Sequence, residues 1–482
     1  MEDIDESSHE QEISEKKFPK PEYIRRGYYL SAAIFALIVI SILPTPEGLS
    51  TRGQRALGIL AFVTILWVTE VFPLGLTALL GSILLPLLGI VNPSNAFIGF
   101  SSTALFFLMG GISFGIAMQK TNLHKRVALK FLQKFGKGSS RIMLGVCLLG
   151  GLMAFTMPAH AVAALLLPVL MGIVEAGEIS QDENFGIAIF LALTYSTSVG
   201  SIATLLGGAR NVLALGILER AAEDISVGFL EWVIAGSPIA LILIFTVFIV
   251  LKTVYPWDKI NASKIRSKLK EEVEDLGEVS VDEKKAGIIF TIAFVLWMTV
   301  GTRIGLATIA IGGLILLVAT RTITWRNIEQ NMPWGLLFLY GGALTLSNAL
   351  SMENVESVQF LALKIQEFIG NYPLIVLISL LVLVLVISNL MSNSAATAVV
   401  LPIAIPTLME LGYPGLLPTY LIAMGSAMAF MLPIATPSAA IVYSSGYVEI
   451  KDLMKAGLVL SIISIIIFLT IGLGWWKVIG VW

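Results

Sequence analysis

The chain has 482 residues, of which 56% are hydrophobic and only 13% are charged. Soluble domains are typically about 45–50% apolar and about 25% charged, so this composition excludes an ordinary soluble protein and predicts an all-α membrane protein surrounded by lipid. The formal net charge of −2 says little as a total, because the positions of the charges decide orientation and ligand attraction. We expect no nucleic-acid partner. The single cysteine, Cys147, excludes an intrachain disulfide and a cysteine-based metal site.

Residues 1–26 are polar and carry charges of both signs. They lack the basic stretch, short apolar core and small-residue cleavage site of a signal peptide. We therefore expect a disordered cytoplasmic tail. Its basic residues, with Arg25 and Arg26 next to the first apolar segment, favour a cytoplasmic N-terminus.

Apolar segments recur along the rest of the chain, and many have the length of about 20 residues that spans a bilayer as a helix. They cover residues 28–45, 55–72, 74–92, 103–119, 141–156, 159–175, 186–222, 230–252, 285–302, 304–320, 334–350, 373–390, 395–411, 416–448 and 455–478. Not all of them are predicted to be simple crossings, because several are separated by very short connections or interrupted by helix-breaking residues.

Two pairs of these segments are joined by connections too short to leave the membrane and return. Segments 141–156 and 159–175 are separated only by Met157-Pro158, and segments 373–390 and 395–411 only by residues 391–394. We therefore predict two re-entrant hairpins, at residues 141–175 and 373–411.

Two longer segments contain interruptions rich in Gly, Pro, Ser and Thr. The segment 186–222 is interrupted between Gly200 and Gly208, and the segment 416–448 between Pro433 and Pro437. Because such residues end helices or break them, we predict that each segment is one discontinuous helix.

An internal repeat relates the two halves of the chain. Leu105–Gly111, with the sequence LFFLMGG, recurs as Leu336–Gly342, with the sequence LLFLYGG, and each copy precedes a charged amphipathic helix, a hairpin and a broken helix. The charged helix after the first copy is basic, and its counterpart around Glu353 and Glu367 is net acidic. By the positive-inside rule the two helices lie on opposite sides of the membrane.

This arrangement predicts two inverted repeats, residues 27–252 and 285–482, joined by a cytoplasmic linker at 253–284. If each hairpin makes no net crossing and each broken helix makes one, the topology has about eleven crossings and an external C-terminus. Inverted repeats with discontinuous helices form the substrate sites of many secondary transporters near the middle of the bilayer.

The interrupted segments also identify the polar groups of the expected site. Non-helical backbone at membrane depth must be buried in protein or line a wet cavity, which predicts a ligand site at the hairpin tips and helix breaks. The chain contains no phosphate-binding loop and no zinc-type histidine cluster, so we expect neither ATP-driven transport nor enzymatic activity. An anion channel remains the alternative from another functional class.

The second-half motifs resemble those of the divalent anion/sodium symporter family. Ser392-Asn393-Ser394 precedes Leu401-Pro402, as in the family's hairpin tip, and Thr436-Pro437 matches its unwound loop. The resemblance spans roughly residues 50–480 and implies a plasma-membrane carrier of dicarboxylates, citrate or sulfate. It also implies sodium coupling, a homodimer, and an elevator movement of the hairpins and broken helices against a scaffold.

The same resemblance assigns roles to individual residues of the second half. It implies that Asn393, Ser394, Thr436 and Pro437 contact the substrate. It further implies a sodium site formed by Ser388, Asn393 and Ala435, since hydroxyl, amide and carbonyl oxygens suit a hard cation. No other cofactor is expected.

The first half departs from the family pattern at both motifs. Pro158-Ala159-His160 replaces the Ser-Asn-Thr tip, and residues 207–211 replace Gly-Thr-Pro-Pro-Asn with Gly-Gly-Ala-Arg-Asn. Ionisable groups at membrane depth are functional candidates, so we expect His160, Ser201, Arg210 and Asn211 to contact the substrate. The hypothesis is that Arg210, with or without a protonated His160, replaces one sodium ion and permits anion exchange or proton-linked transport.

Structural explanations for these two residues remain open. His160 would also fit a helix cap bonded to a carbonyl group, and Arg210 would also fit an interface position reached by snorkelling. A lone arginine with hydroxyl and amide donors suits a carboxylate or a sulfate-like oxyanion equally well. We favour a dicarboxylate as the small anionic substrate, with a sulfate-like oxyanion as the alternative.

Overall fold

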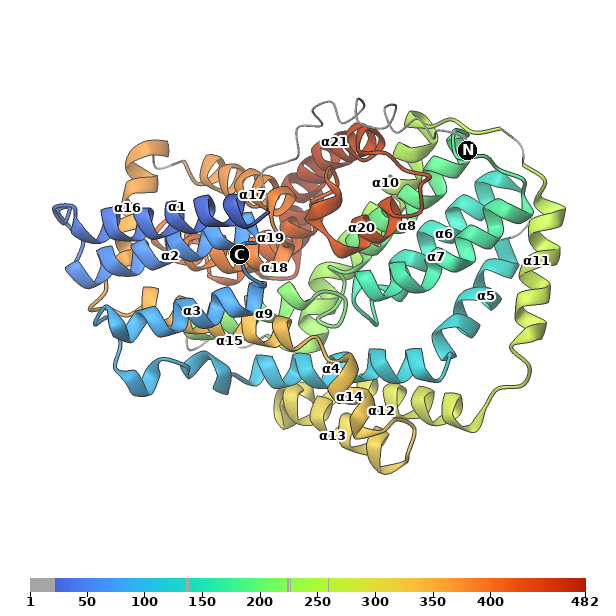
Figure 1. The fold of residues 1–482 in the computed structure, drawn as a ribbon, viewed down its shortest axis with the longest axis horizontal. Helices are drawn as coiled ribbons and strands as arrows, with labels where there is room; N and C mark the ends of the chain where they lie inside the picture. The colour runs from blue at the N-terminus through green and yellow to red at the C-terminus, as the bar shows by residue number, and fades with distance from the viewer. Residues whose placement is uncertain (1–21, 136–137, 223–224, 226, 259, 371) are drawn as a thin grey trace, which may run out of the picture.

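The computed structural model describes residues 22–482 apart from 136–137, 223–224, 226, 259 and 371 (Figure 1). All regular elements in this part of the chain are helices, which confirms the predicted all-α class. The first-half helices are α1 (Glu22–Ile42), α2 (Thr51–Thr69), α3 (Leu74–Leu87), α4 (Thr103–Lys120), α5 (Leu123–Phe135), α6 (Ser139–Met153), α7 (Ala159–Ala176), α8 (Asn184–Gly200), α9 (Ala209–Ala221) and α10 (Phe229–Val254).

The helix α11 (Ala262–Asp275) lies within the segment predicted as the linker. The second-half helices are α12 (Val281–Ile304), α13 (Leu306–Ala319), α14 (Trp325–Asn331), α15 (Trp334–Leu350), α16 (Ser357–Ile369), α17 (Pro373–Leu390), α18 (Asn393–Glu410), α19 (Leu416–Gly425), α20 (Pro437–Tyr443), α21 (Ile450–Ile467) and α22 (Leu473–Val478). Short 3-10 turns occur at Pro93–Asn95, Ile98–Ser101, Ser426–Met428 and Pro433–Ala435, and a π-helical turn at Phe468–Gly472.

The predicted tail differs from the structure at its C-terminal end. α1 begins at Glu22, so residues 22–26 belong to a helix rather than to a disordered segment. Residues 1–21, which make up the rest of the predicted tail, lie outside the described part of the chain.

Both predicted hairpins consist of two helices joined by a short tip. In the first hairpin α6 ends at Met153 and α7 begins at Ala159, with Pro158 at the N-cap of α7. In the second, α17 and α18 are separated only by Met391 and Ser392. The Ser392 hydroxyl accepts a hydrogen bond from the backbone N–H of Ala395 and so caps the start of α18.

Both predicted broken helices are interrupted where Gly, Pro, Ser and Thr gather. α8 ends at Gly200 and α9 begins at Ala209, and α19 ends at Gly425 while α20 begins only at Pro437. The first break passes very close to the first hairpin. A Cβ atom at Gly207 would lie 2.3 Å from the carbonyl oxygen of Ala154, so only glycine fits there.

The two charged amphipathic helices lie at opposite ends of the molecule. Figure 1 places α5, together with the linker helix α11, at one end of the long axis and α16 at the other. That the two helices lie on opposite sides of the membrane stays a prediction.

Eight of the described helices are long and apolar enough to cross a membrane. Three of the eight are arms of the hairpins, namely Ala159–Ala176, Pro373–Leu390 and Asn393–Glu410, so length and hydropathy alone do not give the number of crossings. Shorter apolar helices such as Asn184–Gly200 add to the bundle. The total of about eleven crossings therefore stays a prediction, which depends on how hairpins and broken helices sit in the bilayer.

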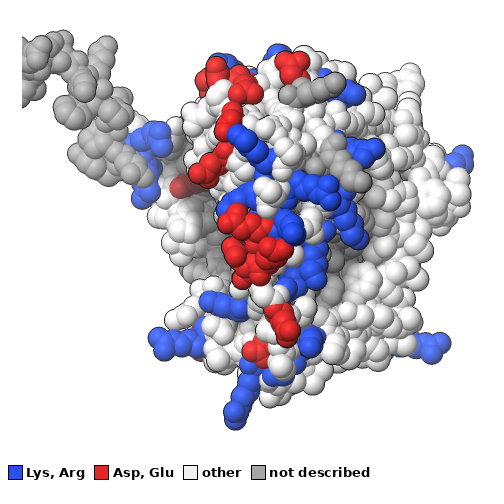
Figure 2. Space-filling view, turned by 90° about the vertical axis from the view of Figure 1, so that its right-hand side faces the viewer, with Lys and Arg blue, Asp and Glu red and all other residues white. Residues whose placement is uncertain are grey.

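Charged side chains of both signs gather on the face that holds α5 and α11 (Figure 2). Arg126 on α5 forms a buried ion pair with Glu283, with 2.8 Å between Nε and Oε1. The same guanidinium donates to the carbonyl oxygens of Leu276, Gly277 and Glu278, which lie between α11 and α12. A single side chain thus fixes the end of the linker to the basic helix.

Candidate functional site

A cavity of about 490 Å³ lies where the hairpin tips and the helix breaks of both halves meet. Its walls include Pro158, Ala159 and His160 from the first tip, residues 207–210 from the first break, residues 392–394 from the second tip, and residues 435–438 from the second break. Polar segments that are far apart in the sequence therefore converge on one space, as the repeat pattern predicted.

The starts of several helices face this cavity. α7, α9 and α18 each contribute their first residues to its wall. Because the N-terminus of a helix carries partial positive charge and unpaired N–H groups, this arrangement favours a bound anion.

The helix α4 forms a largely apolar wall of the cavity, with Phe107, Leu108 and Ile112 among its lining residues. The cavity extends along α4 to the exposed side chain of Gln119, and it also reaches the exposed Asn331 at the end of α14. Gln119 lies one residue before the end of α4, next to the basic helix α5.

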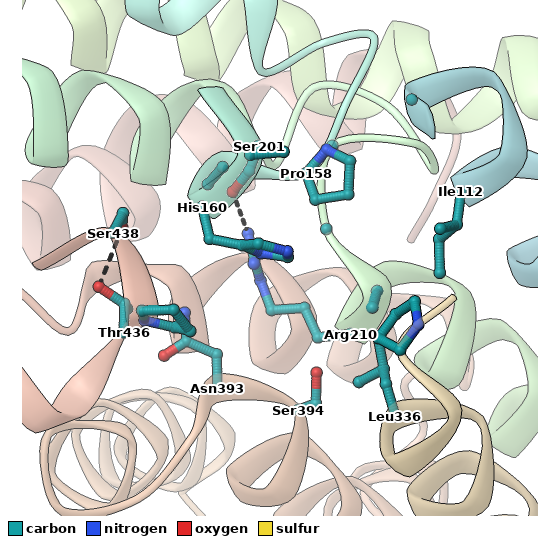
Figure 3. Close-up of a pocket in the computed structure, with 18 of the residues that line it drawn as sticks. Ile112, Pro158, His160, Ser201, Arg210, Leu336, Asn393, Ser394, Thr436 and Ser438 are labelled. Atoms are coloured by element: carbon teal, nitrogen blue, oxygen red, sulfur yellow. Dashed lines mark hydrogen bonds between the residues drawn. The ribbon is translucent and has the colours of Figure 1, made fainter. Parts of the chain in front are cut away.

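Arg210 is the only lysine or arginine that lines the cavity in the described part of the chain, and its side chain is only 5% exposed. Nη2 donates to the hydroxyl of Ser201 at 2.6 Å, and Nε donates to the carbonyl oxygen of Ala423 at 2.9 Å. Figure 3 shows the Arg210 side chain directed toward Ser201, with His160 drawn in the same part of the cavity. The arginine is buried in the protein core and bonded there, which argues against the snorkelling alternative.

The backbone of the first break is held in place by side chains behind the cavity. The amide of Asn211 donates to the carbonyl oxygens of Ser201 and Thr204, and the indole of Trp232 donates to the carbonyl oxygen of Ile202. Asn211 is fully buried and is not part of the cavity wall. The structure therefore places this predicted substrate ligand in a supporting position.

His160 lies in the first turn of α7, and its side chain is exposed to the cavity. α7 has no side-chain cap at its N-terminus, where Pro158 is the N-cap residue. The helix-cap explanation for His160 is therefore not supported. Its imidazole is available to a ligand or to a proton.

The second half presents mainly hydroxyl and amide groups to the cavity. Asn393, Ser394, Thr436 and Pro437, which were predicted to contact the substrate, all line it. The Thr436 hydroxyl accepts from the N–H of Ala439 at the start of α20 and lies 3.1 Å from the hydroxyl of Ser438 (Figure 3). The second half contributes no lysine or arginine to the described lining of the cavity.

Buried oxygen atoms without hydrogen-bond partners occur at the predicted sodium site. Ser388 Oγ and Asn393 Oδ1 are both inaccessible and unpaired, and Ala435 within the second break is 1% exposed. Buried oxygens that lack a partner are costly, and a sodium ion is a ligand that would satisfy them. The residues of the second half therefore fit a small cation.

The first half does not fit a cation in the same way. Pro158 and Ala159 supply no side-chain oxygen, and the hydroxyl of Ser201 already accepts from Arg210. Asn211 Oδ1 is also buried without a partner, but it is a single side-chain oxygen behind the break. At this position the protein has a fixed positive charge instead.

Two residues of the site were not predicted from the sequence. Ala423 accepts from Arg210, and the Tyr340 hydroxyl is buried without a hydrogen-bond partner close to Ser394 and Arg210. Tyr340 carried a sequence signal, because it stands within the repeated motif at the position that Met109 occupies in the first half.

Hairpins and broken helices of two repeats that enclose one cavity define a membrane transporter with a site at the centre of the bundle. A comparison with protein families agrees with this class. The family model described as "Sodium:sulfate symporter transmembrane region" matches residues 25–482. The chain belongs to this family, which confirms the resemblance found in the sequence and makes the protein a transporter rather than an enzyme.

Curated relatives match nearly the whole chain. The chain is 28% identical over 473 residues to the sodium-dependent dicarboxylate transporter SdcS of Staphylococcus saprophyticus, covering 92% of this chain and 90% of the relative. It is also 28% identical over 486 residues to SdcS of Staphylococcus aureus strain MSSA476, covering 95% of this chain and 92% of the relative.

Two solved structures share the fold at low sequence identity. The YdaH transporter of Alcanivorax borkumensis matches with a TM-score of 0.53 and 15% identity, over 95% of this chain and 98% of that chain. MtrF of Neisseria gonorrhoeae, which belongs to a class of antimetabolite efflux pumps, matches with a TM-score of 0.56 and 15% identity, over 95% of both chains. Both neighbours support the predicted transporter fold.

Proposed function

We propose that this protein is a secondary transporter of dicarboxylates that binds its substrate in the cavity between the two halves. The observation that carries the proposal is the buried guanidinium of Arg210 in a cavity that the starts of α7, α9 and α18 also face. These groups together suit an anion with more than one negative charge. Both SdcS relatives are sodium-dependent dicarboxylate transporters, which supports a dicarboxylate.

The two ends of the substrate have different partners in this proposal. One carboxylate binds Arg210, whose planar guanidinium suits a carboxylate group. The other carboxylate binds the hydroxyl and amide groups of Asn393, Ser394 and Thr436. An anion with a charge at only one end leaves either Arg210 or the hydroxyl and amide groups of the second half without a partner, so it binds more weakly.

Sodium accompanies the substrate through the second half. Ser388 Oγ and Asn393 Oδ1, with the carbonyl oxygen of Ala435, are the expected ligands. Arg210 takes the place of a sodium ion in the first half, because it supplies positive charge where the side-chain oxygens are missing. Coupling is therefore expected to need fewer sodium ions than two equivalent sites would bind.

Proton coupling through His160 is the alternative to sodium coupling. Histidine is the side chain that ordinarily titrates near neutral pH, and this imidazole is exposed to the cavity. If it carries the coupling proton, a pH gradient alone drives uptake, and His160→Asn removes that effect while sodium-driven uptake persists.

The proposed movement is of the elevator type, in which the hairpins and broken helices travel together against α4, α12, α13 and α15. The extension of the cavity to the exposed Gln119, beside the basic helix α5, supports a conformation open to the cytoplasm. The protein is further expected to be a homodimer in the plasma membrane, with its N-terminus in the cytoplasm and its C-terminus outside.

A sulfate-like oxyanion is the second candidate substrate, because the description of the family names sulfate. Purified protein in liposomes separates the candidates through uptake of labelled succinate, citrate and sulfate, with and without sodium and a pH gradient. We expect saturable, sodium-stimulated succinate uptake. Sulfate uptake that succinate does not compete for contradicts the dicarboxylate proposal, and single-channel conductance in place of saturable uptake supports the anion channel.

A further inference from the structure

A second cavity, of about 200 Å³, lies beside the start of α4, whereas the central cavity extends toward the other end of that helix. Its walls come from α4, from α9, and from the turn between α12 and α13, which pack against one another (Figure 1). Phe107 and Leu205 line both cavities, so these two side chains lie at the boundary between them. The second cavity is therefore distinct from the proposed substrate site.

The second cavity has a polar mouth and an apolar floor. All of its exposed lining residues are polar, namely Thr103, Glu219, Thr302 and Thr308. The large lining residues that are buried are all apolar, and they include Phe107, Leu205, Val212 and Leu215. Such a cavity suits a molecule with one polar end and an apolar body. Because its volume is below the about 300–1,000 Å³ of drug-sized pockets, the molecule must be small.

Glu219 determines the charge of the mouth, because it is the only charged residue among the described lining residues. Its carboxylate forms no hydrogen bond and no ion pair in the described part of the chain. The next residue, Arg220, is near enough to interact with it electrostatically, but Nη2 of Arg220 donates to the carbonyl oxygen of Ile98 at 3.3 Å. The carboxylate is thus available to a cation that enters through the mouth.

An ammonium group fits this cavity better than a metal ion does. The described residues contain no group of three His, Cys, Asp or Glu that could hold a metal ion, and a bare ion would leave the apolar floor uncovered. An ammonium group instead donates several hydrogen bonds, which the carboxylate of Glu219 and the threonine hydroxyls can accept. An alkyl chain attached to it gains from leaving water for the apolar floor.

We propose that the second cavity binds a small alkylammonium ion, and that the bound ion inhibits transport. The inhibition rests on the proposed function, because in the proposed elevator movement α9 and Leu205 travel past α4 and the α12–α13 turn. A ligand that contacts both sides binds this arrangement better than one in which α9 has moved, so it holds the protein in this state. Substrate binding in the central cavity is not blocked, and the inhibition is noncompetitive.

The test uses the purified full-length protein with pentylammonium as the probe. The control compounds, at equal ionic strength, are 1-pentanol, which has the same chain without a charge, and hexanoate, which has the opposite charge. In detergent we expect pentylammonium to raise the unfolding temperature and the control compounds to leave it unchanged. In liposomes that take up labelled succinate, we expect pentylammonium to lower the maximal rate at an unchanged KM.

The variants test whether the ion binds at this cavity. Glu219→Gln removes the charge at nearly constant size, and we expect it to raise the half-maximal pentylammonium concentration by about tenfold or more in both assays. Ala307→Leu, at the start of α13, fills part of the cavity and should also weaken the response. Glu329→Gln, which changes an exposed residue of α14 outside both cavities, is the matched control and should respond like the wild type.

Equal effects of 1-pentanol and pentylammonium, or an unchanged response in both Glu219→Gln and Ala307→Leu, would overturn the site. A higher KM for succinate at an unchanged maximal rate would place pentylammonium in the central cavity and overturn the inference. Stabilisation without any inhibition would overturn the proposed effect on transport. Uptake of none of the labelled anions would overturn the proposed function alone, because the unfolding temperature tests the site without transport.

Discussion

The Nε atom of Arg210 donates a hydrogen bond to the carbonyl oxygen of Ala423, 2.9 Å away, and so joins the broken helix of one half to that of the other. Ala423 lies in the last turn of α19, where the helix dipole is negative and stabilises a nearby cation. The same guanidinium is thus anchored by the protein on one side and free to bind an anion in the cavity.

Replacement of Arg210 by lysine should show how much of substrate binding depends on the positive charge and how much on the planar shape of the guanidinium. Lysine keeps the positive charge, but a single ammonium group cannot reach Ser201 and Ala423 and also bind a carboxylate as a planar fork. We expect Arg210→Lys to raise the KM for succinate by about 10- to 100-fold, which corresponds to about 1.5–3 kcal/mol for a charged hydrogen bond. We expect the Arg210→Gln variant to bind succinate still more weakly. Wild-type rate and affinity in Arg210→Gln would refute the role of this residue.

Removal of the unpaired oxygens in the second half should weaken sodium binding. In Ser388→Ala and in Asn393→Ala we expect the sodium concentration for half-maximal uptake to rise by about tenfold or more, as for the loss of a ligand worth about 1.4 kcal/mol. The exposed Ser444, whose hydroxyl bonds to the carbonyl oxygen of Ile441 on α20, provides the control. An unchanged sodium dependence in Ser388→Ala would place the cation elsewhere.

The hydroxyl of Tyr340 should contribute to substrate binding and not to the stability of the protein. It is buried, has no hydrogen-bond partner, and lies close to Arg210 and Ser394, on a helix that packs against both α9 and α18. Tyr340→Phe removes an unpaired polar atom, so we expect thermal stability to be unchanged or higher while the KM for succinate rises about threefold to tenfold. Tyr420→Phe, on α19 against Trp232, should change neither quantity. A loss of stability in Tyr340→Phe without a change in KM would show a structural role.

The first helix break should tolerate no side chain at Gly207. A Cβ atom there would lie 2.3 Å from the carbonyl oxygen of Ala154 and would force the hairpin tip away from the break. We expect Gly207→Ala to abolish succinate uptake. The same substitution at Gly312, where a Cβ atom would meet no other atom within 4 Å, should leave uptake unchanged. Normal uptake by Gly207→Ala would mean that the tip and the break are not held in this contact during transport.

The buried ion pair of Arg126 and Glu283 should contribute to stability far from the cavity. Removing one partner of a buried pair leaves an unpaired charge and typically costs about 3–5 kcal/mol. We expect Glu283→Gln to lower the unfolding temperature in detergent clearly, whereas Lys268→Ala, which breaks an exposed pair with Glu271, should cost less than about 1 kcal/mol. Equal effects of the two substitutions would contradict a special role for the buried pair.

Hydropathy and repetition were sufficient to predict much of the architecture. The short connection at Met157-Pro158 could not leave the membrane and return, and the recurring Leu-Phe-Leu motif with its glycine pair related the two halves. These features are local, because they depend on residue type and spacing along the chain. The inverted arrangement followed from the charges of two helices, which the structure places at opposite ends of the molecule.

The individual contacts of the site could not be predicted from the sequence and are seen only in the tertiary structure. Arg210 and Ala423 are 213 residues apart, and no pattern in the sequence pairs a side chain with the carbonyl of an alanine. Asn211 was predicted to bind substrate. It instead stabilises the backbone of the first helix break, because its amide donates hydrogen bonds to the carbonyl oxygens of Ser201 and Thr204 behind the cavity.

Residue composition and spacing alone establish that the chain is a helical membrane protein in two related halves, because the cost of exposing polar backbone to lipid leaves few other solutions. They also identify the polar tips and breaks from which the cavity is built. The folded arrangement was needed to show which of these groups face the cavity, which support it from behind, and that the charge of Arg210 lacks an acidic partner among the described residues lining it. Those properties depend on how helices far apart in the chain pack together, and no local stretch of sequence encodes them.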